Sequence, residues 1–315
     1  EYIYMNFFDN IHKQIMKGSH WKRIMLVLTL FLIIIFAMKT MTPKQEGFVQ
    51  LNKFERFSSP HEIYDSFYAD IYDEIYHSDL LCEHSFAKIK EISKPSKTSR
   101  VLDVGCGTGC MMEEFTKANI PIQGIENSQA MINKAKEKNT LFKIKKENVL
   151  NTMAYPNEEF THILCLYFTI YYLGDKHMFF QNAYNWLEPG GTLVIHLVNR
   201  DKFDPIVPAG NPLLFVSPQR YAKERITNSV IKFKDFQYKS NFRSDPADDK
   251  AYFNEEFRDD STGKVRKHEH VFYMPSQKSI IGIAKDVGFI LKKKFDMVEL
   301  QYEYQYLYFL QKPYD

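Results

Sequence analysis

The stretch VLDVGCGTG, residues 101–109, decides the fold of this chain. Its first four residues form a nearly continuous apolar run, interrupted only by Asp103, which is typical of a parallel strand buried on both faces. Three glycines follow at every second position, and such a loop lets a ligand approach the backbone closely. Residues 111–117 have a helical composition, so the loop leads into a helix whose first N–H groups face the same edge.

A second apolar strand, predicted over 120–125, ends in Glu126, about 20 residues beyond the first strand. An acid at this place accepts hydrogen bonds from the two hydroxyls of a ribose. Two nucleoside-binding families share the arrangement. Dinucleotide dehydrogenases usually carry Gly-x-Gly-x-x-Gly and need no Asp within the strand, whereas this loop reads Gly-x-Gly-x-Gly after Asp103.

The motif resembles the first motif of the class I S-adenosylmethionine-dependent methyltransferases. LEPGGTLVI, residues 187–195, is similar to that family's passage from a helix through Pro-Gly-Gly into a strand. Tyr64-Asp65-Ser66-Phe67-Tyr68 resembles the Tyr-Asp-x-x-Tyr opening of small-molecule N-methyltransferases, including those that dimethylate amino sugars. The resemblance implies an α/β Rossmann-like fold with a seven-stranded, mostly parallel sheet whose last strand is antiparallel.

Hydrophobic periodicity places the elements along the chain. Strands are predicted over 101–104, 120–125, 140–145, 161–167, 192–198, 290–298 and 302–312, and helices over 61–76, 80–92, 111–117, 128–136, 176–187 and 279–287. Residues 200–278 interrupt this alternation, and they predict an inserted antiparallel sheet of about three strands, over 229–242, 251–258 and 265–274. The expected domains are an N-terminal segment over 1–44, a methyltransferase domain over 45–199 and 279–315, and the insert as a cap over the substrate. Residues 40–60 are interpreted as a linker.

The resemblance also implies the residues that hold S-adenosylmethionine (SAM). They come from the glycine loop, from the ends of the second, third and fourth strands, and from the residues after them: Asp103, Gly105, Cys106, Gly107, Thr108, Gly109, Glu126, Asn127, Asn148, Val149, Leu166 and Tyr167. Asn148 also suits a turn, which is the alternative interpretation of that residue.

Catalytic residues are harder to predict, because methyl transfer from a sulfonium depends mainly on placing the nucleophile. Four side chains are candidates for the transfer site: Tyr68, Tyr172, His196 and His270. Tyr68 belongs to the aromatic stripe of the helix over 61–76, which either docks that helix or covers the cofactor. His268 and His270 share one face of a strand and could be half of a metal site, but no third ligand is evident, so no metal is predicted.

The insert also carries several ionisable groups on its hairpin: Glu255, Glu256, His268, Glu269 and His270. They predict an acidic lid that favours an acceptor arriving as an ammonium ion. The alternative is that these charges face water, as charges on a small antiparallel sheet usually do.

The net charge of +2 excludes a dedicated nucleic-acid binder, whose footprint is a concentrated basic surface. The chain has four cysteines, Cys82, Cys106, Cys110 and Cys165, without metal-site spacing. They are interpreted as buried thiols of a reducing compartment.

Residues 24–38, IMLVLTLFLIIIFAM, carry no charge. A helix of this length is somewhat shorter than a hydrocarbon core of about 30 Å, and flanking residues can extend it. A cleaved signal peptide would be followed by a small-x-small site, and a core helix would show polar positions, so a single membrane anchor over about 22–40 is expected. Lysine and arginine counts on the two sides are equal, but the chain has no Asn-x-Ser/Thr acceptor, which favours a cytosolic catalytic domain.

The sequence thus predicts a SAM-dependent methyltransferase that acts on a nitrogen or oxygen of a small molecule. A membrane lipid or quinone methyltransferase is the first alternative, because an anchor concentrates membrane-resident acceptors near the enzyme. A protein methyltransferase and a non-catalytic scaffold with the same fold are the others.

Overall fold

The computed structural model describes residues 55–76, 79–207, 209, 219, 222–300 and 302–314, together with a few positions between 21 and 31. The chain divides into two units, Glu1–Glu46 and Gly47–Asp315. The predicted membrane anchor lies largely outside the described residues. Among the residues that are described, no helix is both long enough and apolar enough to cross a membrane.

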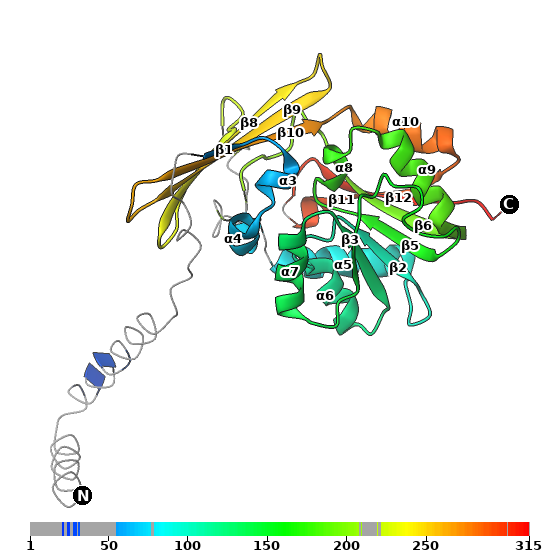
Figure 1. Cartoon of the computed structure of the whole chain (residues 1–315), viewed down its shortest axis with the longest axis horizontal. Coiled ribbons are helices and arrows are strands. Elements are labelled where there is room, and N and C mark those ends of the chain that lie inside the picture. The colour runs from blue at the N-terminus through cyan, green and yellow to red at the C-terminus, as the bar shows by residue number, and fades with distance from the viewer. Residues whose placement is uncertain are drawn as a thin grey trace, which may run out of the picture. The chain divides into compact units, whose positions relative to one another are not determined.

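The larger unit is built on a seven-stranded sheet (Figure 1). In spatial order its strands are β11 (Ile290–Asp296), β12 (Gln305–Gln311), β6 (Leu187–Val198), β5 (Phe160–Cys165), β2 (Val101–Val104), β3 (Ile122–Glu126) and β4 (Ile144–Lys146). Strands β6, β5, β2, β3 and β4 run parallel, and β12 pairs antiparallel with both β6 and β11. The mostly parallel sheet with an antiparallel strand is therefore confirmed.

Helices cover both faces of this sheet. They are α5 (Asp79–Ser93), α6 (Cys110–Lys117), α7 (Gln129–Lys138), α8 (Thr169–Tyr172), α9 (Lys176–Trp186) and α10 (Gln277–Val287). Side chains of β2, such as Val101 and Leu102, alternate between a core under α5 and α6 and a core under α9 and α10. Strand β4 is shorter than predicted, because Asn139 forms a turn in which its side chain accepts the Leu141 N–H.

A second sheet is formed by β1 (Glu55–Phe57), β10 (Val265–Tyr273), β9 (Lys250–Asp259), β8 (Phe236–Asp245) and β7 (Asn228–Lys232), in that order. The strand predicted over 229–242 is instead the hairpin β7–β8, since the chain turns at Phe233, whose N–H donates to the Phe236 carbonyl. The predicted linker is also corrected, because residues 55–57 of it pair in parallel with β10.

The single helix predicted over 61–76 is two helices, α3 (Pro60–Ile63) and α4 (Ser66–Tyr76). Asp65 causes the break, because one of its carboxylate oxygens accepts the Tyr68 N–H and the other pairs with Arg266 of β10. In Figure 1, α3 and α4 lie between the second sheet and α7. Phe67 of α4 contacts Phe257 of β9, and Asp70 pairs with Lys134 of α7.

The expectation of four free cysteines is wrong for two of them. Cys82 at the start of α5 and Cys110 at the start of α6 form a disulfide, with their Cα atoms 6.2 Å apart. The packing of α5 on α6 brings these positions together, and no sequence spacing indicates it. Cys106 and Cys165 are free and buried, as expected.

Candidate functional site

The glycine loop joins β2 to α6 and borders a large cavity. Gly107 has φ +53°, and a Cβ there would meet only the Gly105 carbonyl oxygen, 4.0 Å away. The space beside it is thus left open for a ligand. A Cβ at Gly105 would instead lie 2.6 Å from a Thr169 methyl, so that glycine permits the close approach of the loop to α8.

Glu126 at the end of β3 is held against this loop by the backbone. Its Oε2 accepts the Gly107 N–H at 3.0 Å, and its Oε1 accepts the Asn127 and Ser128 N–H groups, each at 2.9 Å. Burial raises the pKa of Glu126, and the three N–H groups offset part of that rise. A carboxylate has about four lone-pair sites, so one remains for a ligand hydroxyl on the cavity side.

The cavity has a volume of about 840 Å³, within the usual range for small-ligand sites. Seven of the residues predicted to hold the cofactor line it: Gly105, Gly107, Glu126, Asn127, Asn148, Val149 and Tyr167. Asn148 also forms a turn, because its side chain accepts the Leu150 N–H at 2.9 Å. Tyr167 and the next residue, Phe168, adopt left-handed φ values of +43° and +57°, a strained backbone of the kind found at ligand sites.

The other predicted cofactor residues lie behind the cavity wall. Asp103 is buried, and burial followed by the charge of Glu126 raises its pKa to about 8. The Cys106 thiol packs towards Gly124, and Thr108 donates to Asp73 at 2.5 Å. Gly109 packs against Phe142, and Leu166 is buried in the core under α5 and α6. These residues shape the loop, and their side chains do not line the cavity.

All four candidates for the transfer site line this same cavity: Tyr68, Tyr172, His196 and His270. The two tyrosines come from α4 and α8, His196 comes from β6, and His270 comes from β10. Chain segments far apart in sequence therefore meet at the cavity that the glycine loop borders.

His196 is buried, and burial lowers its pKa to about 4, so its imidazole is neutral near pH 7. The neighbouring Gln305 side chain offsets part of this lowering, although neither ring nitrogen meets hydrogen-bond geometry with a described residue. A neutral imidazole with free nitrogens at the cavity wall can bind a polar group of a ligand.

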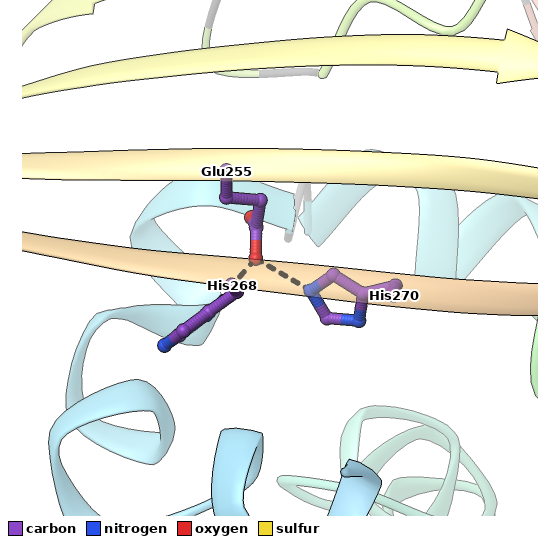
Figure 2. Close-up of side chains that lie close together, drawn as sticks. All are labelled: Glu255, His268 and His270. Atoms are coloured by element: carbon purple, nitrogen blue, oxygen red, sulfur yellow. Dashed lines mark hydrogen bonds and ion pairs between the residues drawn. The ribbon is translucent and has the colours of Figure 1, made fainter. Parts of the chain in front are cut away.

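Glu255 of β9 is the functional residue that the sequence analysis missed as a partner of the histidines. Figure 2 shows its carboxylate between His268 and His270. Its Oε2 lies 3.2 Å from His268 Nδ1 and 2.7 Å from His270 Nε2, and its Oε1 accepts the hydroxyls of Tyr76 and Tyr238. Burial alone would raise the pKa of Glu255, but the two histidines more than offset this and hold it well below its usual range.

The sequence did contain a signal for this pairing. In a hairpin whose strands end at Arg258 and resume at Val265, residues equally distant from the turn face each other. Counting three residues back from Arg258 and three forward from Val265 places Glu255 opposite His268, as the register has it.

Two tyrosines continue the network into the cavity. The Tyr172 hydroxyl lies 2.6 Å from His270 Nδ1, and the Tyr64 hydroxyl donates to Tyr172 at 2.9 Å. Burial raises the pKa of both phenols well above the usual value, so both keep their protons.

The predicted acidic lid is corrected by this geometry. Glu256 pairs with Lys267 at 2.9 Å, and Glu269 pairs with Arg56 at 2.6 Å, on the opposite side of the strands from Glu255. Because side chains alternate along a strand, only Glu255, His268 and His270 of the five groups point inward.

Comparison with known proteins identifies the family. A methyltransferase domain family matches residues 72–293, well over half of the chain. Two curated ubiquinone biosynthesis O-methyltransferases from strains of Rhodopseudomonas palustris are 31% identical over 105 residues, which is 32% of this chain and 41% of each relative. The chain thus matches about two-fifths of the length of these relatives.

Solved structures share the fold at low identity. The CcbJ methyltransferase from Streptomyces caelestis is 17% identical, with a TM-score of 0.61 over 79% of this chain and 98% of that one. A SAM-dependent methyltransferase from Clostridium acetobutylicum is 17% identical, with a TM-score of 0.59 over 78% and 98%. A SAM-bound amino pentose methyltransferase from Micromonospora echinaspora is 17% identical, with a TM-score of 0.54 over 75% and 92%. The chain therefore belongs to the methyltransferase domain family and shares the fold of SAM-dependent methyltransferases.

Proposed function

We propose that this enzyme transfers a methyl group from SAM to an oxygen or nitrogen of a small molecule. One observation carries the proposal: Gly107, Glu126, Tyr172 and His270 all border a single cavity. Bound SAM supplies an electrophilic methyl group, and the acceptor needs only to be held in line with it while water is excluded.

In this proposal the cofactor lies along the glycine loop. Glu126 accepts a ribose hydroxyl, and the open space beside Gly107 admits the ligand. Asn148 and Val149 are proposed to border the adenine. Two observations support this fit. The Glu126 carboxylate keeps one free lone pair, and a side chain at Gly107 would fill the open space beside the loop.

The second sheet is proposed to be the cap over the acceptor. Its His270 lines the cavity together with Phe242 of β8, Phe253 of β9 and Phe272 of β10. Two more phenylalanines, Phe168 and Phe203, reach the cavity from the segments after β5 and β6. This lining favours an acceptor with an apolar or aromatic body and one polar, reacting group.

A quinone or lipid acceptor is the second candidate, and two features favour it. The aromatic lining suits such a molecule, and the uncharged run over 24–38 would bring the enzyme to the membrane that contains it. The partial likeness to ubiquinone biosynthesis O-methyltransferases supports the same candidate.

We also propose that residues 24–38 anchor the chain in a membrane, with the catalytic domain in the cytosol. The absence of Asn-x-Ser/Thr acceptors supports this side. The Cys82–Cys110 disulfide is the feature that opposes it, because disulfides persist in oxidising compartments.

A screen with SAM carrying a labelled methyl group tests the function. The purified chain is incubated with three pools, namely polar metabolites, amines and a lipid extract, and labelled products are separated and identified. We expect label in a small molecule from one pool. Label in none of the three pools although SAM binds, with label in a protein mixture tested in parallel, would contradict a small-molecule acceptor.

A further inference from the structure

We infer that Tyr172, His270 and Glu255 form a proton relay that accepts the proton which the methyl acceptor loses. The inference rests on the proposed function and extends it, because it requires an acceptor with a dissociable O–H or N–H. The three residues come from α8, β10 and β9, and a hydrogen-bond chain joins them from the cavity to the interior of the second sheet.

The direction of each hydrogen bond follows from Glu255. Its Oε1 already accepts two tyrosine hydroxyls, as a carboxylate does, and a carboxylate can only accept, so the proton between its Oε2 and His270 belongs to Nε2 of the histidine. In the resting relay that we propose, the His270 imidazole carries this one proton, which leaves Nδ1 as an acceptor. Tyr172 must therefore donate its hydroxyl proton to that nitrogen, at 2.6 Å.

The Tyr172 oxygen has one lone pair left for the substrate. It accepts the Tyr64 hydroxyl through the other lone pair and donates its own proton to His270. Tyr172 and His270 line the cavity, whereas Glu255 lies behind them and is 2% exposed. An O–H or N–H group of the methyl acceptor can thus donate to the Tyr172 oxygen, whose own proton is already hydrogen-bonded to His270.

Arg266 determines which ring nitrogen of His268 carries the proton. Its Nε donates to His268 Nε2 at 2.7 Å, and its guanidinium also pairs with Asp65 at 2.9 Å. Because arginine always donates, His268 Nε2 must be the unprotonated nitrogen, and Nδ1 carries the proton that points at Glu255. The two histidines are therefore predicted to be opposite tautomers, although they are two residues apart on one strand.

This assignment decides between a proton relay and a metal site. Glu255, His268 and His270 place three ligand-type atoms within 4.8 Å of one another. A metal ligand must be an unprotonated nitrogen, but the proton assignments place hydrogen on both nitrogens that face Glu255. The cluster is therefore built to hold protons.

The transfer balances as follows. The acceptor's lone pair forms the bond to the methyl carbon, and the electron pair of the broken carbon–sulfur bond stays on sulfur and neutralises its charge. The acceptor proton passes to the Tyr172 oxygen while the phenol proton passes to His270 Nδ1, so the phenol is neutral again. His270 becomes an imidazolium beside the Glu255 carboxylate, which stabilises it, and it later returns the proton to water.

Tyrosine hydroxyls and rings from two other elements surround the relay. Tyr76 of α4 and Tyr238 of β8 donate to Glu255, and Tyr68 of α4 lies against both histidines. Arg266 and Asp65 form an ion pair beside the relay, so the Glu255 carboxylate is stabilised by the hydrogen bonds that it accepts. Tyr172 is thus the catalytic residue, His270 is the proton acceptor, and Glu255 is a positioning residue.

The first test needs no acceptor. In the full chain labelled with 15N-histidine, long-range proton–nitrogen NMR spectra distinguish the tautomers. We expect the Nε2–H form for His270 and the Nδ1–H form for His268. Glu255→Gln should remove the preference at His270, while Glu256→Gln, the same change on the neighbouring side chain that faces solvent, should leave both spectra unchanged.

The second test measures turnover with labelled SAM, with catechol and glucosamine as hydroxyl and amine probes. Tyr172→Phe and His270→Gln should lower the rate at pH 7 by about 100-fold or more, the usual size of general-base effects. SAM affinity should stay within twofold. At pH 9.5 the loss should shrink, because the probes then lose their protons without help.

These outcomes separate the relay from the proposed function. Failure of SAM to bind contradicts the function, whereas an Nδ1–H tautomer at His270, or a tautomer preference that survives Glu255→Gln, overturns the relay. Equal turnover by Tyr172→Phe and the unaltered chain also overturns it. If SAM binds and neither probe is methylated, the tautomers alone decide whether the relay exists.

Discussion

At the scale of single residues, Gly107 gives the sharpest test of the cofactor site. Its φ of +53° and the open space at its Cβ position mean that Gly107→Ala adds a methyl group directly to the cavity wall. We expect this substitution to weaken SAM binding by at least tenfold, because the ligand must approach the backbone there. Isothermal titration calorimetry measures the effect.

Gly263 provides a matched control. It lies in the β9–β10 turn with φ +66°, and no atom lies within 4 Å of its Cβ position. Gly263→Ala thus imposes a similar backbone strain away from the cavity, and SAM affinity should remain within twofold. If the two variants bind SAM equally well, Gly107 does not border the cofactor.

Asp103 predicts a pH dependence of stability with a defined sign. Its folded-state pKa of about 8 lies above its ordinary value of 3.8. Between these pH values the folded chain keeps a proton that the unfolded chain has lost, so the free energy of unfolding falls as pH rises from about 4 to about 8. Asparagine does not titrate, so Asp103→Asn removes this fall in the free energy of unfolding. Without SAM, the drop in Tm between pH 5 and pH 8 should shrink by at least about 2–4 °C, the shift that 1 kcal/mol produces in a large domain. Parallel Tm profiles for the two proteins would contradict a neutral Asp103.

At the scale of elements, local patterns predicted most of the seven-stranded sheet. The apolar run at 101–104, the acid at the end of β3 and the Ser128 cap of α7 are each encoded within a few neighbouring residues. The break between α3 and α4 could not be predicted this way, because it depends on Arg266, far along the chain. Strand β1 escaped prediction for the same reason, since its partner is β10.

Phe257 tests whether the second sheet and α4 form one packed layer. It is fully buried on β9, and its ring lies 5.4 Å from that of Phe67 and 6.1 Å from that of Tyr68, both on α4. Phe257→Ala should cost about 3–5 kcal/mol of unfolding free energy, the usual cost of such a cavity. Denaturant unfolding followed by circular dichroism measures this loss.

Val230→Ala on β7 is the control, because that side chain is 74% exposed and its truncation should change the unfolding free energy by less than about 0.5 kcal/mol. A loss at Phe257 no larger than the loss at Val230 would mean that the second sheet does not depend on α4 for its packing.

At the scale of the whole molecule, the site joins parts of the chain that local sequence patterns treat separately. The glycine loop and Glu126 follow from a motif, and the candidates Tyr172 and His270 were each proposed alone. What the sequence left open was that Glu255 and Tyr64 link them into one network, since three separate elements must pack before these side chains meet. Long-range packing, rather than any local pattern, creates the acceptor side of the cavity.

The last prediction concerns the uncharged run over 24–38. If it anchors the protein, the full chain sediments with membranes and resists carbonate extraction, because burying about 15 apolar residues in lipid outweighs loss of surface charge attraction. Deletion through Met41 should release the protein, and so should the substitution of Ile33 and Ile35 by lysine, since a charge near the bilayer centre costs about 2.5–3.5 kcal/mol per residue. Exchanging Thr29 for Ala, which keeps the run uncharged, is the matched control and should leave sedimentation unchanged.

Protease added to sealed vesicles then reports the side of the membrane: a cytosolic catalytic domain is digested in vesicles whose cytosolic face is outward. Release of the intact chain by carbonate would contradict the anchor, and protection of the catalytic domain would place it on the side that the Cys82–Cys110 disulfide favours.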